Sequence, residues 1–328
     1  MRALLHTAGE RLAIECDLPW VADLIEESAG AELVKRGSTS SSIRIRVEAE
    51  RAPFDVRGWA LLTRGAWHRD GRIVMEDPCT AGFDMLASCD EDGARFTFRW
   101  RPNPRSRAAG LALRSRFYLL ARAVLVQYPA MWWAGAHGRA PLHASAFSTG
   151  AVTPLLAGPG GVGKSTLLFR ELADEATAVG DNLCVADGST VWGLVEPLRI
   201  KGGPGRRMPH GRGEAPFPSR AREQVPDRVV VVRRGSAERP VVRRCEPEDA
   251  ARWLTAGTYM AGELRRYWGF AAALSLGTGA ALAHQPVGLT ASTFARRLPC
   301  IEVILGRVPG VRLSELLRSE DVDTWTRT

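Results

Sequence analysis

Lysine is scarce in this chain: only Lys35, Lys164 and Lys201 accompany a large excess of arginine, although the formal net charge is +8. The six cysteines form no C-x-x-C pair and have no nearby histidine, which argues against a zinc site and against a disulfide scaffold. The apolar stretch 269–283 is too short and too rich in glycine to span a bilayer. These absences predict a cytoplasmic protein without a targeting signal or a membrane partner.

The positive charge is concentrated in residues 199–244, a stretch that also contains many glycines and prolines. Such a segment can be a solvated basic loop, or it can bind an anion, an acidic partner or nucleic acid. No nucleic-acid recognition module is visible, and aromatic residues are not interleaved with the arginines. Nucleic acid is therefore the least favoured partner.

The length predicts two domains, with a boundary near residue 135. Residues 1–135 contain short alternating segments that predict a half-exposed antiparallel sheet, followed by a helix over 111–127. The β segments expected in this domain are 42–48, 73–75 and 94–100. Residues 136–328 predict an α/β domain.

A P-loop is the most specific motif in the second domain. Residues 158–166 read GPGGVGKST and match G-x-x-x-x-G-K-[ST]. Glycines let the backbone N–H groups surround phosphates, Lys164 would reach the β- and γ-phosphates, and the Ser165 hydroxyl would coordinate Mg²⁺. The predicted nucleotide-binding residues are Gly158, Gly160, Gly161, Val162, Gly163, Lys164, Ser165 and Thr166. The alternative is an incidental glycine-rich turn before a helix.

The flanking sequence favours the P-loop, because a predicted strand precedes the motif and a predicted helix follows it. The expected order is strand 141–148, a turn, strand 151–157, the P-loop, helix 166–176 and strand 177–181. Residues 201–226 predict a mobile loop with too much glycine, proline and charge to pack. A buried strand at 229–232, a mainly helical segment from Pro247 and a last strand at 300–305 complete the domain.

P-loop enzymes usually carry an acid at the end of a strand near the phosphates. The apolar strand 229–232 is followed by two arginines, so Asp181 is the better candidate. Its distance from Lys164 is about that of a chain that runs along one helix and returns beside the loop as the next strand. Alternatively, Asp181 is a simple turn former before Asn182.

These residues together resemble the kinase domain of HPr kinase/phosphorylase and its HPr kinase-related relatives. His143 in PLHAS, the P-loop and Gly180-Asp181-Asn182 reproduce the order and approximate spacing of that family, in which a Leu-His strand precedes the P-loop and an Asp-Asp pair follows it. The resemblance covers about residues 141–199, and the final PCIEVILGR strand fits more loosely. It implies a P-loop kinase domain with a smaller β-rich (α+β) domain in front.

The resemblance implies that Asp181 is the catalytic base and that Lys164 and His143 act beside the phosphates. By itself, His143 would be interpreted as an ordinary strand histidine. Two departures stand out: Asn182 replaces the second acid of the pair, and the run 198–203 (LRIKGG) lacks the metal-binding Glu that the bifunctional enzymes have before a glycine-rich loop. Ser165, Asn182 and, in place of that Glu, Glu196 would bind the metal, and the substrate is expected at Arg199, Lys201, Arg206 and Arg207.

The sequence thus predicts an ATP- and Mg²⁺-dependent kinase that phosphorylates a serine or other hydroxyl on a protein or peptide. The resemblance allows HPr or a natural-product precursor peptide, such as a lasso-peptide precursor, as the acceptor. The alternatives are a P-loop ATPase or nucleotide switch without an acceptor, and a nucleic-acid-binding protein that uses the arginine-rich loop. The nucleotide preference, reversal of the reaction and assembly into a homo-oligomer stay open.

Overall fold

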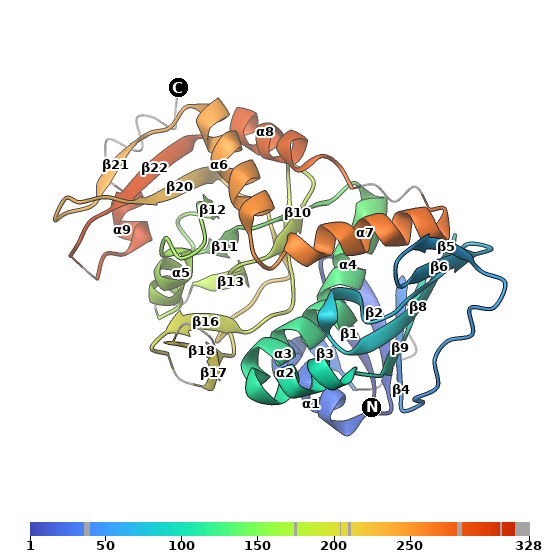
Figure 1. The fold of residues 1–328 in the computed structure, drawn as a ribbon. Coiled ribbons are helices and arrows are strands. Elements are labelled where there is room, and N and C mark those ends of the chain that lie inside the picture. The colour runs from blue at the N-terminus through green and yellow to red at the C-terminus, as the bar shows by residue number, and fades with distance from the viewer. Residues whose placement is uncertain are drawn as a thin grey trace. The chain divides into compact units, whose positions relative to one another are not determined.

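The computed structural model describes residues 1–35, 40–173, 176–203, 205–208, 211–280, 284–308 and 310–318. The fold is mixed α/β, with several mixed and antiparallel sheets, as the sequence predicts at that level (Figure 1). The chain forms two compact units. The first contains Met1–His137, Arg207–Pro209 and Arg265–His284, and the second contains Gly138–Arg206, His210–Leu264 and Gln285–Thr328.

A single sheet with strand order β3-β1-β2-β4-β9-β8-β7-β6-β5 organises the first unit. Its strands are β1 (Arg2–Thr7), β2 (Glu10–Cys16), β3 (Leu33–Val34), β4 (Ile43–Glu48), β5 (Ala60–Thr63), β6 (Ala66–Arg69), β7 (Arg72–Met75), β8 (Phe83–Asp90) and β9 (Gly93–Trp100). The expectation of a purely antiparallel sheet is wrong, because β4 runs parallel to both β2 and β9. The alternation in β4 is confirmed: Ile43, Ile45 and Val47 are buried between exposed arginines.

Helices pack on this sheet and close the apolar core of the first unit. They are α1 (Pro19–Ala29), η1 (Gly30–Glu32), η2 (Pro78–Thr80), α2 (Pro104–Ala112), α3 (Arg114–Arg122), the π-helical η3 (Ala123–Gln127), α4 (Tyr128–Ala134), η4 (Gly135–His137) and α7 (Arg265–Thr278). Helix α4 lies against β2 and β4, and α7 lies against β6, β7 and β8. The helix expected over 111–127 is broken at Leu113, between α2 and α3. From Arg114 the helical segment runs through the π turn of η3 to Ala134, and Pro129, which lacks an amide hydrogen, lies two residues after that turn.

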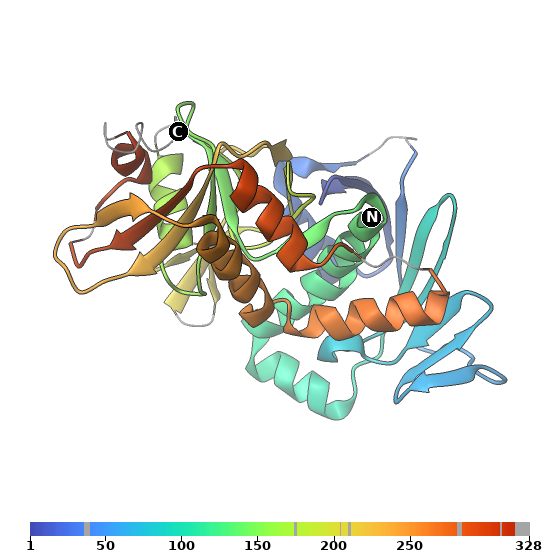
Figure 2. The ribbon, with the colours of Figure 1, turned by 90° about the horizontal axis from the view of Figure 1, so that it is seen from above.

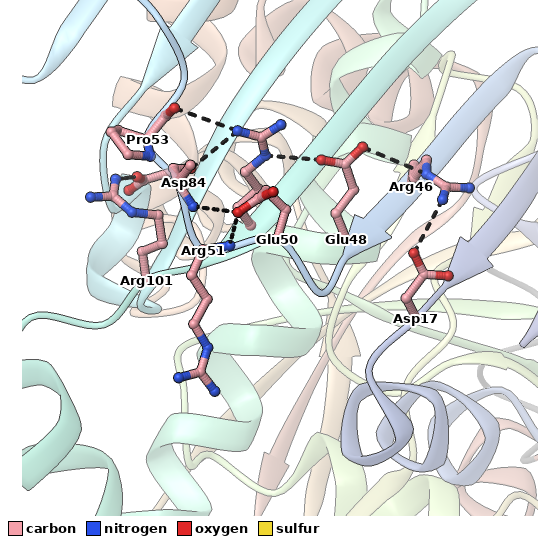
Figure 3. Close-up of polar contacts among 10 residues, drawn as sticks. Asp17, Arg46, Glu48, Glu50, Arg51, Pro53, Asp84 and Arg101 are labelled. Atoms are coloured by element: carbon pink, nitrogen blue, oxygen red, sulfur yellow. Dashed lines mark hydrogen bonds and ion pairs between the residues drawn. The ribbon is translucent and has the colours of Figure 1, made fainter.

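Ion pairs cross neighbouring strands of this sheet (Figure 3). Arg46 on β4 pairs with Glu15, its partner in register on β2, and with Asp17 at 3.1 Å. Glu48 on β4 accepts a hydrogen bond of 2.9 Å from Arg99, its partner in register on β9. The positive and negative charges on these strands are therefore matched in pairs across the ladder.

The second unit contains a central sheet with the order β13-β11-β12-β20-β22-β21. These strands are β11 (Ser145–Ser148), β12 (Pro154–Ala157), β13 (Thr177–Gly180), β20 (Arg228–Arg234), β21 (Val241–Arg244) and β22 (Cys300–Leu305). Strands β12, β20 and β22 are parallel, whereas β11 is antiparallel to both β12 and β13. Valines at 229–232 are buried, which confirms the predicted central strand.

Four helices accompany this sheet: α5 (Lys164–Leu172), α6 (Pro247–Met260), α8 (Val287–Arg297) and α9 (Leu313–Leu317). Leu167 and Leu168 of α5 share a buried cluster with Leu156, Val230 and Val303 of the sheet. Helix α6 packs on β12, β20 and β22, and α8 lies alongside α6, as Figure 2 shows. The sheet thereby has helices on both faces, and this packing fixes the end of β12, where the P-loop begins.

Two smaller sheets are formed mainly by residues of the second unit, with Arg207 and Met208 of β17 assigned to the first, and they correct two expectations. Their strand orders are β10-β14-β15-β19 and β16-β18-β17, formed by β10 (Ala140–Leu142), β14 (Cys184–Ala186), β15 (Val191–Gly193), β19 (Glu223–Gln224), β16 (Leu198–Lys201), β17 (Arg206–Met208) and β18 (Arg212–Ala215). The strand expected over 141–148 is split, because β10 pairs with β14 while β11 joins the central sheet.

The segment 201–226 also differs from the expected unpacked loop. Strand β18 pairs in antiparallel register with β16, and Gly213 and Glu214 within it are buried. Gly202 and Gly211 adopt positive φ angles of 68° and 67° at the turns of this hairpin. The glycines therefore make turns between strands instead of preventing strand formation. Among the described residues, no helix has the length and apolar character needed to cross a membrane.

Candidate functional site

The P-loop, residues 158–163, connects β12 to the first turn of α5. Gly158 has a φ of 146°, and a Cβ atom there would lie 2.6 Å from the carbonyl oxygen of Val232. Gly163 has a φ of 125°, and its carbonyl accepts hydrogen bonds from the amides of Thr166 and Leu167, each at 3.0 Å. Only glycine adopts both of these backbone conformations without strain. The two glycines therefore allow the loop to turn directly into the N-terminus of α5, where an anion is stabilised.

Lys164, the first residue of α5, is folded into this loop. Its side chain is buried, and Nζ donates hydrogen bonds to the carbonyl oxygens of Gly158 at 2.8 Å and Pro159 at 3.3 Å. Burial lowers the pKa of Lys164 to about 8, although the carboxylates of Asp181 and Glu263 oppose that shift. The amine therefore remains mostly protonated at pH 7 and supplies a positive charge beside the loop.

Asp181 lies directly after β13, at the same edge of the sheet as the P-loop. The edge is shared because β12 and β13 are both antiparallel to β11. The sequence predicts that β13 returns next to the strand that leads into the P-loop. In the structure β11 lies between β12 and β13. The Ser145 hydroxyl on β11 donates a hydrogen bond to the Asp181 carbonyl and so fixes the turn that follows β13.

Asp181 is 1% exposed, and both of its carboxylate oxygens are buried. Burial and the neighbouring Glu196 raise its pKa to about 6, while the Ser165 hydroxyl, the Arg199 guanidinium charge and the Arg199 backbone N–H lower it. A buried carboxylate with a raised pKa is able to take up a proton.

Glu196 and Arg199 form a buried layer beneath this turn. One oxygen of Glu196 accepts the amides of Asn182 at 3.2 Å and Leu183 at 3.0 Å, and the other accepts Arg199 Nη2 at 2.9 Å. Arg199 Nη1 donates to Glu263 at 3.2 Å. Burial opposes the charge on Arg199, but Glu196 and Glu263 outweigh it and raise the pKa of Arg199 above its usual value.

His143 occupies the break between β10 and β11. Its amide donates to Thr258 Oγ1 at 3.0 Å, and its Nε2 lies 3.2 Å from Asn182 Oδ1. Since the amide oxygen can only accept, Nε2 carries the hydrogen, which leaves Nδ1 unprotonated and without a partner in the described structure. Burial and the charge of Lys164 lower the pKa of His143 to about 4, so the ring is neutral at pH 7.

A cavity of about 420 Å³ opens at this place in the second unit. Its described lining consists of His143, Gly160, Gly161, Gly163, Lys164, Ser165, Thr166, Asn182, Arg199, Lys201, Arg212, Arg234 and Glu263. Most of the predicted site residues are thus together. The described lining does not include four buried residues, Gly158, Val162, Asp181 and Glu196, nor Arg206 and Arg207 on β17. Cationic side chains dominate the wall, which favours a phosphate-bearing ligand.

Arg234 and Glu263 also line the cavity, although sequence reasoning did not select them. Arg234 ends β20, the parallel neighbour of β12, and its Nε donates to the Val162 carbonyl at 3.0 Å. The two arginines that follow the strand 229–232 could therefore have indicated a cation at the P-loop. Glu263 follows α6, far along the chain, and no motif marks it.

Metal binding by protein groups alone has little support at this site. Among the described residues, no three histidine, cysteine or acidic side chains are grouped to hold an ion. Glu196 uses both oxygens for Asn182, Leu183 and Arg199, which gives it a structural role. Ser165 and Asn182 do line the cavity, so a Mg²⁺ ion here would depend on nucleotide oxygens for most of its ligands.

A comparison of the chain with models of known protein families produced no match, and a comparison with curated proteins produced no significant match. The functional argument therefore depends on the chemistry of the site.

Proposed function

We propose that this chain is a P-loop phosphotransferase that uses Mg-ATP to phosphorylate a hydroxyl group on a protein or peptide. The observation that carries the proposal is the buried Asp181 carboxyl group, whose pKa is raised to about 6, next to a P-loop residue, Ser165, that lines a cation-rich cavity. Lys164 and Ser165 of the P-loop are its electrostatic neighbours. This combination pairs a proton acceptor with a phosphate site, which kinase chemistry requires.

In the proposed reaction, Asp181 takes the proton of the acceptor hydroxyl as that oxygen attacks the γ-phosphorus of ATP. The bond from the γ-phosphorus to the bridging oxygen breaks, and ADP leaves with the electron pair. Lys164 and Arg234 stabilise the negative charge on the transferred group and the leaving oxygen. Ser165 and Asn182 would hold Mg²⁺, which neutralises phosphate charge when bound.

His143 positions Asn182 in this scheme. Because its Nε2–H donates to Asn182 Oδ1, it orients the amide oxygen at the cavity wall. The low pKa of His143 keeps this ring from adding a second positive charge beside Lys164. Glu196 has an equivalent function for the backbone, since it holds the amides of Asn182 and Leu183.

A second candidate function is ATP hydrolysis without a phosphoacceptor, because a cavity that holds Mg-ATP beside a buried base could also activate water. Both Asp181 oxygens are buried from water itself, and Asp181 is not part of the described cavity lining. Neighbouring side chains therefore have to move before either water or an acceptor hydroxyl reaches Asp181, as loops and side chains commonly do in kinases.

The test is intact-mass analysis of serine-containing peptides, beginning with peptides encoded beside this protein, after incubation with Mg-ATP. We expect a gain of one phosphoryl group with the wild-type chain and none with Lys164→Ala. ADP release is measured in parallel with and without each peptide. Equal ADP release in both conditions, with no mass gain in any peptide, would establish the hydrolase and reject the kinase.

A further inference from the structure

The first unit contains a second cavity, of about 340 Å³, which no part of the proposed reaction uses. Its lining consists of Arg51, Trp100, Arg101, Pro102, Asn103 and Arg107. Arg51 follows strand β4, residues 100–103 lead from β9 into α2, and Arg107 lies on α2. The volume is at the small end of the range for small-ligand pockets.

Two of the arginines that line this cavity have no acceptor for their guanidinium N–H groups among the described protein residues. The guanidinium groups of Arg51 and Arg107 have no partner among the described residues, and both side chains are exposed. Figure 3 shows the Arg51 side chain leading away from the neighbouring chain of ion pairs. Both guanidinium groups are therefore available to a ligand that carries acceptor oxygens.

One acid partly balances the arginines. Asp84 is 4% exposed and pairs with Arg101, which is held at the cavity wall as a result. No ion pair of the Arg51 or Arg107 guanidinium is found among the described residues, and the adjacent Glu50 carboxylate accepts the Arg51 backbone amide at 2.7 Å. Other arginines of the first unit show the contrast, because Arg46 and Arg99 pair with acids on neighbouring strands.

We propose that this cavity binds a carboxylate side chain of an acidic segment in the acceptor polypeptide. The proposal depends on the proposed function, in that the acceptor is a polypeptide. A planar carboxylate can accept paired hydrogen bonds from a guanidinium group. Nucleic acid fits less well, because the Trp100 ring packs edge-on against Trp20 with centroids 5.3 Å apart, whereas base binding uses open aromatic faces.

The test is fluorescence anisotropy with fluorescein-labelled hexaglutamate, without nucleotide and at low salt. The variant is Arg51→Gln/Arg107→Gln. The matched control is Arg11→Gln/Arg64→Gln, which removes the same charge from exposed arginines outside the cavity of the same unit. We expect the cavity variant to bind about tenfold more weakly than the wild type, and the control to stay within about twofold, because only cavity arginines contact the ligand.

Equal weakening in both double variants would reject the site and leave only diffuse attraction to a basic surface. Binding of labelled hexathymidylate that is lost in the cavity variant, without binding of hexaglutamate, would also overturn the proposal and assign the cavity to nucleic acid. The measurement contains no nucleotide, so a negative result leaves the proposed phosphotransfer intact. Conversely, a chain that transfers no phosphate can still show hexaglutamate binding.

Discussion

Arginines and acids are arranged in opposite ways on the sheet of the first unit and in the P-loop cavity of the second. On the sheet, Arg46 lies between Glu15 and Asp17, and these side chains are close to half exposed. At the P-loop, Lys164 and Asp181 are buried, and burial is the largest cause of both pKa shifts. Basic and acidic side chains are therefore solvated and paired in the first region, and desolvated with shifted pKa values in the second.

The difference teaches that a net charge of +8 has no single meaning in this chain. Exposed pairs are screened by salt and contribute little to stability. A buried charge without a full set of partners has its pKa shifted and is available for chemistry. The following predictions test this contrast, beginning with the largest effect.

Lys164→Ala should reduce phosphotransfer by about 10³-fold, because it removes the buried positive charge that stabilises the transferred group. The measurement is the steady-state rate with saturating Mg-ATP. Lys35→Ala is the control, since Lys35 is an exposed residue that pairs with Glu26 in the first unit. A Lys164→Ala rate similar to that of the control would exclude the P-loop from the mechanism.

Asp181→Asn should reduce transfer by about 10²-fold or more at pH 7.5, the loss typical of a missing general base. In the wild type, kcat/KM should rise with pH through about 6, as Asp181 loses its proton, and fall through about 8, as Lys164 loses its own. The variant should lack the rising limb. Asp249→Asn, an exposed acid on α6, should keep the full profile. An unchanged rising limb in Asp181→Asn would assign the base to another group.

Arg212→Gln should raise the KM for ATP by about tenfold, since Arg212 lines the cavity and a charge-assisted hydrogen bond to phosphate has about that value. Arg206→Gln is the matched control, because Arg206 lies on β17 outside the described lining. Its KM for ATP should not change. The reverse result would place the nucleotide against β17.

The local order of strand, glycine loop and helix was predictable, because a P-loop needs glycine at strained positions such as Gly158 and Gly163. The position of Asp181 was also predictable, because the number of residues after Lys164 is enough for one helix and a return to a strand end beside the loop. The split between β10 and β11 was not predictable from the sequence. At this break the His143 amide donates a hydrogen bond to Thr258, a residue far along the chain. Tertiary contacts of this kind leave no periodic signal in the sequence.

The hairpin of β16 and β18 was missed for a related reason. Glycine and proline were interpreted as preventing strands in 201–226, whereas Gly202 and Gly211 supply the positive φ angles at its turns. Glu263 was missed because its hydrogen bond with Arg199 forms only when α6 brings residues distant in the sequence together. Composition describes how a segment behaves alone, and pairing partners decide what it becomes in the fold.

Asp181→Asn should also stabilise the chain at pH 8. The folded-state pKa of Asp181, about 6, is above the usual value of 3.8, so folding disfavours the ionised form. The resulting loss of stability grows as pH rises from 3.8 to about 6 and is complete above that range. The difference of about two pKa units corresponds to about 3 kcal/mol. Thermal unfolding should show the Tm of the variant several degrees above wild type at pH 8, with the difference shrinking below pH 6 and vanishing near pH 3.8. A pH-independent difference would mean that packing, and not charge, is responsible.

The smallest effect is expected on the sheet of the first unit. Arg46→Gln removes ion pairs with Glu15 and Asp17, but all three side chains are substantially exposed, and water replaces the lost contacts at little cost. Its Tm should match that of the wild type within error, in both low and high salt. Arg199→Gln provides the buried counterpart: its loss leaves Glu196 and Glu263 without their shared partner, so its Tm should fall clearly. If Arg46→Gln lowered the Tm as much as Arg199→Gln, burial would not be what separates the two regions.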